Sequence, residues 1–148
     1  GTGPFVTELF GDEAERIRDI GQEFGSTTGR PRRVGWLDLP LLQHAVRVNG
    51  TNALVLTGLG VLSQLPNVKV CTGYTDQSGK PMGTLPTTIG EVENLQPEFI
   101  EITPDGEALN RDAASTAWVR ELIDAIETVC PVGAICIGRS RDEVIWLD

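Results

Sequence analysis

Three arginines lie within four positions of a chain that is otherwise acidic. Arg30, Arg32 and Arg33 follow the stretch GSTTG at residues 25–29, whereas the 148 residues together carry a formal net charge of −9. Each guanidinium is a planar, permanent cation that binds carboxylate or phosphate oxygens two at a time. We therefore expect small anions to offset the mutual repulsion of these side chains.

The residues before the arginines are also suited to binding small anions. The two glycines of GSTTG let the backbone approach a ligand closely, and its serine and two threonines offer hydroxyl and N–H donors. Pro31 stiffens the segment. The pattern predicts a loop that holds a carboxylate on its Ser-Thr-Thr side and phosphate or ribose oxygens on its arginine side.

Two other interpretations of the arginine segment stay open at this point. Surface arginines commonly pair with Asp and Glu, of which the chain has 21. A nucleic-acid patch is the other interpretation, but the acidic balance repels polyanions and no aromatic residues are interleaved with the arginines. We expect no nucleic-acid partner.

Length and composition are typical of one globular domain. A chain of 148 residues, 40% hydrophobic and 22% charged, can bury a sizeable core. No apolar run approaches the roughly 18 residues that span a bilayer, and the first residues do not resemble a signal peptide. We expect a single domain without an internal boundary, located in the cytoplasm and without a membrane partner.

The cysteines and the histidine predict no metal site. Cys71, Cys130 and Cys136 lack CxxC spacing, and His44 has no Cys or His partner at metal-ligand spacing. We expect reduced, buried cysteines and a surface or packing role for His44.

Two helices are expected to hold the arginine segment between them. Residues 12–24 place apolar side chains on a 3.6-residue period and are followed by Gly25, a typical C′ residue. Asp38 can cap a second helix, which directs Leu42, Ala45 and Val46 to one face and ends at residues 49–50.

Strands alternate with helical patterns along the rest of the chain. We predict a helix over 112–129, a hairpin connection or surface loop over 75–88, and strands over 53–56, 68–71, 99–102, 132–137 and 143–147. This alternation implies an α/β architecture.

Six segments together resemble the adenylosuccinate synthetase family, and specifically its C-terminal part. They are GTGPFVTEL (1–9), GQEFGSTTGRPRRVGWLD (21–38), VNG (48–50), LTGLGVL (56–62), VKVCTGY (68–74) and IGRSRDEVI (137–145). The first two segments are highly specific, and the resemblance spans nearly the whole chain. It implies an α/β fold related to P-loop NTPases, with a mixed central sheet flanked by helices.

The resemblance also implies a reaction and a set of ligands. Members of the family join L-aspartate to the 6-position of IMP, a purine nucleoside monophosphate, after a nucleoside triphosphate has phosphorylated the 6-oxygen. The aspartate loop would be Ser26, Thr27, Thr28, Gly29 and Arg30. Arg30 would also reach the monophosphate, and Arg32 the triphosphate donor. The donor base would contact Gly58, Leu59, Gly60, Cys136, Ile137 and Gly138.

The chain departs from the family pattern where the donor base would bind. The family has TKLD where residues 57–60 read TGLG, and its Lys and Asp recognise guanine. An Asp carboxylate can accept from N1–H and the 2-amino group of guanine, whereas Gly60 offers no such acceptor. The change predicts a donor that is not guanine-specific, such as ATP or dATP.

Loss of the Lys and Asp that recognise guanine leaves two interpretations open. The phage-type 2-aminoadenylosuccinate synthetases, which act on dGMP, are similar in depending on adenine nucleotides, so GMP or dGMP is a candidate acceptor besides IMP. A divergent or decayed copy fits equally well. Two smaller departures are Cys136, where the family often has serine, and Pro-Asp-Gly at 104–106, where it has Pro-Gly-Trp.

The family's phosphate-binding loop, catalytic Asp and catalytic His belong to its N-terminal half, and no GDEGKGK-like stretch occurs here. We therefore expect no catalytic residue and no metal ligand in this chain, with the Mg²⁺ ligands outside it. The chain is then the C-terminal segment of a longer enzyme, a subunit completed by an N-terminal partner, or a non-catalytic remnant that binds nucleotides or a partner. The resemblance further implies a homodimer.

Overall fold

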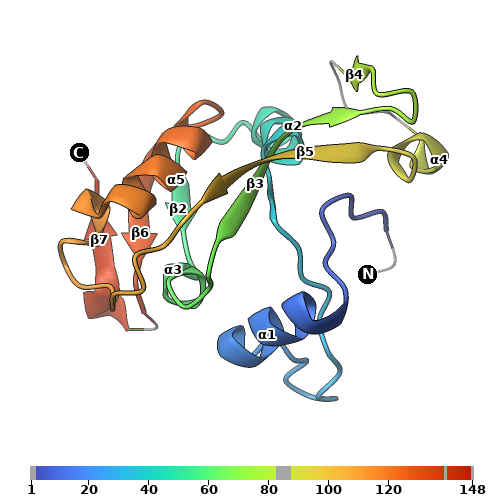
Figure 1. Ribbon diagram of the computed structural model, residues 1–148. Coiled ribbons are helices and arrows are strands. Elements are labelled where there is room, and N and C mark those ends of the chain that lie inside the picture. The colour runs from blue at the N-terminus through green and yellow to red at the C-terminus, as the bar shows by residue number, and fades with distance from the viewer. Residues whose placement is uncertain (1–2, 83–87, 139, 148) are drawn as a thin grey trace. The chain divides into compact units, whose positions relative to one another are not determined.

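Figure 1 shows the computed structural model, which describes residues 3–82, 88–138 and 140–147. The chain divides into two compact units, residues 1–41 with 69–100 and residues 42–68 with 101–148. Each unit is built from two separated stretches, so no single point of the sequence divides them. A single domain without an internal boundary stays a prediction.

Helices and strands alternate along the chain. The helices are α1 (Gly11–Gly21), α2 (Leu39–Asn49), α3 (Leu59–Leu62), α4 (Ile89–Val92) and α5 (Ala117–Glu127), with the 3-10 turns η1 (Ala113–Ser115) and η2 (Arg141–Glu143). The strands are β1 (Leu37–Asp38), β2 (Leu54–Leu56), β3 (Val68–Thr75), β4 (Pro81–Met82), β5 (Gln96–Ile102), β6 (Val132–Cys136) and β7 (Val144–Trp146). The α/β class with mixed sheets is confirmed.

One sheet is organised around β3. Strand β1 pairs with β3 in parallel, β4 returns antiparallel to β3 as a hairpin, and β5 also pairs with β3. The hairpin connection expected over 75–88 is therefore present, although residues 83–87 lie outside the described residues. The core beside this sheet contains Cys71, Tyr74 and Leu95, which are buried against Val6 and Met82.

The second sheet has the order β2-β6-β7, with β2 parallel and β7 antiparallel to β6. Helix α5 packs on this sheet, and in Figure 1 it crosses in front of β6. Its buried side chains recur on the helical period: Trp118, Val119, Leu122, Ile123 and Ile126. The helix predicted over 112–129 is interrupted because Thr116 is extended (φ −67°, ψ 131°), which separates η1 from α5.

Helix α1 ends earlier than the apolar pattern predicted. Gln22 adopts the left-handed conformation (φ 54°) and its N–H donates to Arg18 O, so the helix stops at Gly21, and Gly25 is not its C′ residue. Phe24 instead forms an antiparallel bridge with Pro31. Phe24, which the periodicity assigned to the helix, thus pairs across the loop instead.

Helix α2 begins as predicted. An Asp38 carboxylate oxygen accepts the Leu41 N–H at 3.0 Å, which satisfies one of the free donors of the first turn. His44 is exposed, as expected of a surface residue. Ala45 is also exposed, so the predicted inward face of this helix is correct only for Leu42 and Val46, which are half-buried.

At residues 104–106, where the sequence has Pro-Asp-Gly in place of the family's Pro-Gly-Trp, the chain makes a local turn. Pro104 is buried, Gly106 has φ +78°, and an Asp105 carboxylate oxygen accepts the Glu107 N–H at 3.0 Å.

Among the described helices, none combines the length and the apolar character that a membrane-spanning helix needs.

Candidate functional site

The predicted aspartate loop is a closed turn. Gly25 donates its N–H to Arg30 O and accepts the Gly29 N–H, each at 2.8 Å. The Phe24–Pro31 bridge closes the base of the turn. Gly29 has φ +64°, a conformation that a residue with a side chain adopts only at a cost. Local backbone bonds therefore define the shape of the loop.

The tip of this turn presents donors to solvent. Ser26, Thr27 and Thr28 are exposed, and the Thr28 hydroxyl accepts the Arg30 N–H at 3.4 Å. Within the described part of the chain, the backbone N–H groups of Ser26, Thr27 and Thr28 donate to no other group. Successive unbonded N–H groups in a turn are suited to binding an anion such as a carboxylate.

The three arginines differ in their partners. Arg32 pairs with Glu23 at 3.0 Å, with both side chains well exposed, and Arg33 pairs with Glu8. Arg30 is exposed and has no hydrogen-bond or ion-pair partner for its side chain among residues 3–82, 88–138 and 140–147. Arg32 and Arg33 thus pair with carboxylates of the same chain, whereas the binding of small anions by these arginines stays a prediction.

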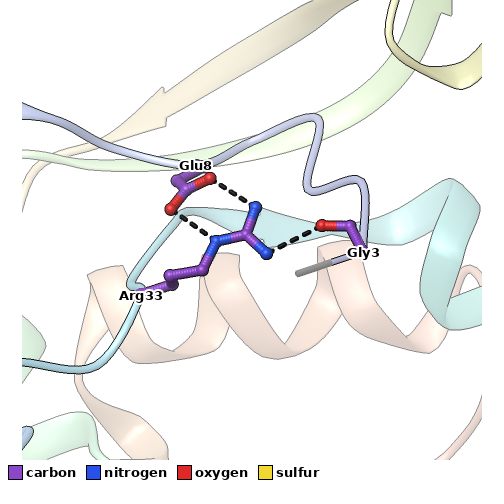
Figure 2. Close-up of polar contacts among 3 residues, drawn as sticks. All are labelled: Gly3, Glu8 and Arg33. Carbon is purple, nitrogen blue, oxygen red and sulfur yellow. Dashed lines mark hydrogen bonds and ion pairs between the residues drawn. The ribbon is translucent and has the colours of Figure 1, made fainter. Parts of the chain in front are cut away.

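Arg33 donates hydrogen bonds to two residues of the N-terminal segment, Gly3 and Glu8, as Figure 2 shows. Its Nε and Nη2 donate to the two Glu8 carboxylate oxygens at 2.7 and 2.5 Å, and its Nη1 donates to Gly3 O at 2.7 Å. The guanidinium also lies over the Phe5 ring, 5.4 Å from its centroid. The hydrogen bond to Arg33 lowers the pKa of Glu8, and the bond to Glu8 raises the pKa of Arg33. We call Gly3, Phe5, Glu8 and Arg33 the Arg33 clamp.

The two predicted donor segments belong to the second unit, and the structure brings them together. Because β2 and β6 are parallel, residues 58–60 and 136–138 follow the same edge of the sheet. They also touch, since a Cβ placed on Gly60 would lie 3.3 Å from Ile137 O. The carboxyl edge of parallel strands is where α/β proteins commonly bind ligands.

The side chains near this edge restrict what can bind there. Leu59 is 1% exposed, so its side chain is packed in the core and unavailable to a ligand. Gly58 has φ +80° and precedes α3. Cys136 and Ile137 are half-buried, and Ile137 donates its N–H to Glu143 O at 3.0 Å.

Gly138 lies against the carboxylate of Glu143. A Cβ on Gly138 would overlap that carboxylate, so a side chain here would displace the end of the Glu143 side chain. One Glu143 carboxylate oxygen accepts the Ser140 N–H at 2.7 Å, as part of a capping box that begins η2. This half-buried carboxylate has a structural role in the turn.

A buried polar pair lies in the first unit and was not predicted from the sequence. The Tyr74 hydroxyl lies 2.5 and 2.6 Å from the two carboxylate oxygens of Asp38, to which it donates, and both residues are buried. Burial, followed by the bond to Asp38, raises the pKa of Tyr74 well above its usual value. The sequence does not reveal this pair, because Asp38 and Tyr74 lie 36 positions apart and meet only in the folded chain.

The three cysteines are free, as predicted, but they are not equally buried. Cys71 and Cys130 are buried, whereas Cys136 is half-buried. The expectation of burial is thus correct for two of the three. The residues that the structure describes contain no group of three or more His, Cys, Asp or Glu side chains placed to hold a metal ion.

Comparison with known proteins identifies the family. The family model of adenylosuccinate synthetase matches residues 1–145, and the chain belongs to this family. The adenylosuccinate synthetase of Pelobacter propionicus is 42% identical over 156 residues, covering 99% of this chain and 35% of that protein. A chloroplastic adenylosuccinate synthetase of Zea mays is 40% identical over 152 residues, covering 99% of the chain and 31% of the relative.

A solved structure agrees with this assignment. The fully ligated adenylosuccinate synthetase of Plasmodium falciparum superposes with a TM-score of 0.84 and 29% sequence identity, covering 100% of this chain and 37% of that one. The chain thus spans about a third of the length of the relatives it matches and corresponds to their C-terminal part.

Proposed function

We propose that this chain is the C-terminal part of a purine-nucleotide ligase of the adenylosuccinate synthetase type. The complete protein joins L-aspartate to the 6-position of a purine nucleoside monophosphate and hydrolyses a nucleoside triphosphate. The observation that carries the proposal is the hydrogen-bonded turn at residues 25–30, where the N–H groups at the tip and the Arg30 guanidinium have no partner among the described residues. A cytoplasmic location is part of the proposal.

The turn accounts for the binding of aspartate. The N–H groups and hydroxyls of Ser26, Thr27 and Thr28, together with the Gly29 backbone, receive one substrate carboxylate. Arg30 binds a carboxylate and the monophosphate through its planar fork. Arg32 reaches the triphosphate, which must compete with the exposed Glu23 for its guanidinium. Such groups act by orienting the reactants and neutralising their charge.

The donor segments support an adenine nucleotide such as ATP or dATP. The side chains of Gly58, Leu59, Gly60, Cys136, Ile137 and Gly138 include no carboxylate, and the nearby Glu143 is engaged by Ser140. A guanine base would find no acceptor on these side chains for its N1–H and 2-amino groups. The acceptor is IMP, GMP or dGMP.

The second unit supports completion by an N-terminal portion of the polypeptide. Strand β2 has β6 on one side and no described partner strand on the other. Val55 on β2 and Trp146 on β7 are large apolar side chains on the two strands that flank β6. Val55 is 56% and Trp146 is 78% exposed. Parallel strands normally have both faces covered, which gives the missing portion a surface to pack on.

The catalytic groups and the Mg²⁺ that accompanies the triphosphate belong to that N-terminal portion in this proposal. The described residues offer no metal site, so no step is assigned to the ion here. The homodimer implied by the family resemblance stays a prediction, which sedimentation of the complete protein would test.

Turnover measured with varied substrates tests the proposal. The protein carrying its N-terminal portion is assayed for triphosphate consumption with ATP, dATP or GTP, with and without aspartate, and with IMP, GMP or dGMP. We expect consumption only when aspartate and one acceptor are both present, with ATP or dATP preferred over GTP. Nucleotide binding without aspartate-dependent turnover would instead support the non-catalytic remnant.

A further inference from the structure

The Arg33 clamp uses the hydrogen-bonding fork of Arg33 within the chain. Nε and both terminal nitrogens donate to protein oxygens, and one face of the guanidinium lies over Phe5. Arg33 follows the predicted ligand-binding residues directly in sequence. Its contacts nevertheless give it a different task from that of Arg30.

All clamp partners of Arg33 come from one short segment that is fixed to the residues after the loop. The Leu9 N–H donates to Val34 O at 2.9 Å, and the Trp36 N–H donates to Thr7 O at 3.1 Å. The Thr7 hydroxyl donates to Trp36 O at 2.7 Å. The segment Gly3–Leu9 therefore lies along the chain that leaves the loop.

Gly35 permits this close approach. A Cβ at position 35 would lie 2.5 Å from Thr7 O and 2.6 Å from the Phe5 ring. The two backbones would have to separate to admit any side chain.

The clamp adjoins the base of the aspartate loop. Arg32, the residue before Arg33, donates its N–H to Glu23 O at 3.0 Å and accepts the Arg18 Nε at 2.8 Å on its carbonyl. Helix α1, the incoming arm of the loop and the N-terminal segment thus hold two consecutive residues. Within the described part of the chain, the Arg30 side chain has no hydrogen-bond or ion-pair partner, so its direction depends on the backbone that carries it.

We propose that the Arg33 clamp positions the aspartate loop, with Arg33 and Glu8 as positioning residues that touch no substrate. By fixing the outgoing arm, the clamp sets where the N–H groups of residues 26–28 and the Arg30 guanidinium point. By neutralising Arg33 with Glu8, it leaves Arg30 as the cation that is free for substrate. This inference rests on the proposed function, because it takes residues 25–30 as the aspartate site.

Hydrogen exchange tests the positioning directly and needs no activity. The variants are Arg33→Lys, which keeps the charge but loses the planar fork, and Glu8→Gln, which removes the carboxylate charge. The reporter amides are Gly25, Gly29 and Arg32, which bond across the loop. Arg120→Lys is the matched control, because Arg120 is an exposed arginine paired with Asp124 in the other unit.

We expect both clamp variants to accelerate exchange of the three reporter amides by about tenfold, while the Val70 amide in β3 stays unchanged. Wild-type exchange in Arg33→Lys would show that charge alone suffices and would overturn the clamp geometry. Equal acceleration at Val70 and the loop in both variants would show that the pair holds the whole unit, which also overturns the proposal.

Kinetics of the complete protein separate this inference from the proposed function. In both variants, KM for aspartate should rise about tenfold, with kcat and KM for the triphosphate within about twofold of wild type. An unchanged aspartate KM with a lower kcat would contradict positioning. If the wild-type protein has no aspartate-dependent turnover, the proposed function fails, and the exchange experiment still decides whether the clamp orders the loop.

Discussion

Arg30 and Arg33 are the same residue type three positions apart, yet their guanidinium groups have opposite surroundings. Glu8 binds Arg33 from 25 positions earlier in the chain, whereas no described residue binds the side chain of Arg30. The spacing of the arginines predicts a concentration of charge. It cannot predict which guanidinium is neutralised, because that depends on a tertiary contact with the N-terminal segment.

Acid should weaken the Glu8–Arg33 pair. The hydrogen bond from Arg33 holds the pKa of Glu8 below its usual 4.5, with the charges of Arg33 and Arg18 adding to it against the opposing effect of burial. A carboxyl whose pKa is lower in the folded state stabilises that state above its unfolded pKa, and the contribution disappears as pH falls through the folded pKa. Denaturant unfolding should therefore show a gap in stability between wild type and Glu8→Gln at neutral pH that closes as the pH falls below 4.5 and through the lowered pKa of folded Glu8. Parallel curves would contradict this account of the pair.

The three thiols should differ in reactivity. Burial, with a further contribution from the Asp38 charge, raises the pKa of Cys71 to about 11. At pH 8 only about one Cys71 in a thousand would then be thiolate, the reactive form. We expect alkylation of the native protein to modify the half-buried Cys136 first and the buried Cys71 and Cys130 only after unfolding.

Cys136 also reports on the donor segments. In the protein carrying its N-terminal portion, ATP should slow the labelling of Cys136, whereas aspartate alone should not. A labelling rate of Cys136 that does not change with ATP would argue against donor binding beside residues 136–138.

At the scale of elements, Gly35 sets how closely the N-terminal segment approaches the chain that leaves the loop. Gly35→Ala would press a methyl group against Thr7 O and Phe5. We expect it to lower the free energy of unfolding by about 1–3 kcal/mol, the usual cost of overpacking. Gly133→Ala is the control, since its nearest atom would be Ala53 Cβ at an ordinary 3.7 Å. A loss no larger for Gly35→Ala than for this control would refute the close approach.

Most elements were predictable because their local signals agree with their packing. The periodicity over 112–129 identified the buried face of α5, and Asp38 identified the start of α2. The early end of α1 was not predictable, because Phe24 pairs with Pro31 across the loop. Tertiary pairing overrides helical periodicity at that point.

The sequence proposes the residues of the candidate site but does not indicate their contacts. The aspartate loop was found from the residue types and the family resemblance together. The donor segments came from the resemblance alone, and they meet because β2 and β6 are parallel neighbours, which no spacing along the chain reveals. Glu8 and Tyr74 were missed for the same reason.

At the scale of the whole molecule, the exposed apolar side chains of Val55 and Trp146 should become covered in the complete protein. Trp146 is 78% exposed, whereas Trp36 and Trp118 are buried. Acrylamide should therefore quench mainly Trp146 in the isolated chain, and Trp146→Phe should remove that quenchable fraction. In the protein with its N-terminal portion, the fraction should fall sharply. Equal quenching with and without that portion would contradict packing against these side chains.

We propose that the turn at residues 25–30 binds the aspartate substrate through Arg30. The most direct test of this claim compares aspartate saturation for wild type, Arg30→Lys and the control Arg120→Lys in the complete protein. We expect kcat/KM for aspartate to fall about a hundredfold in Arg30→Lys, because lysine cannot reproduce the two-point contact, and to stay near wild type in the control. An Arg30→Lys protein that saturates with aspartate as the wild type does would contradict the claim.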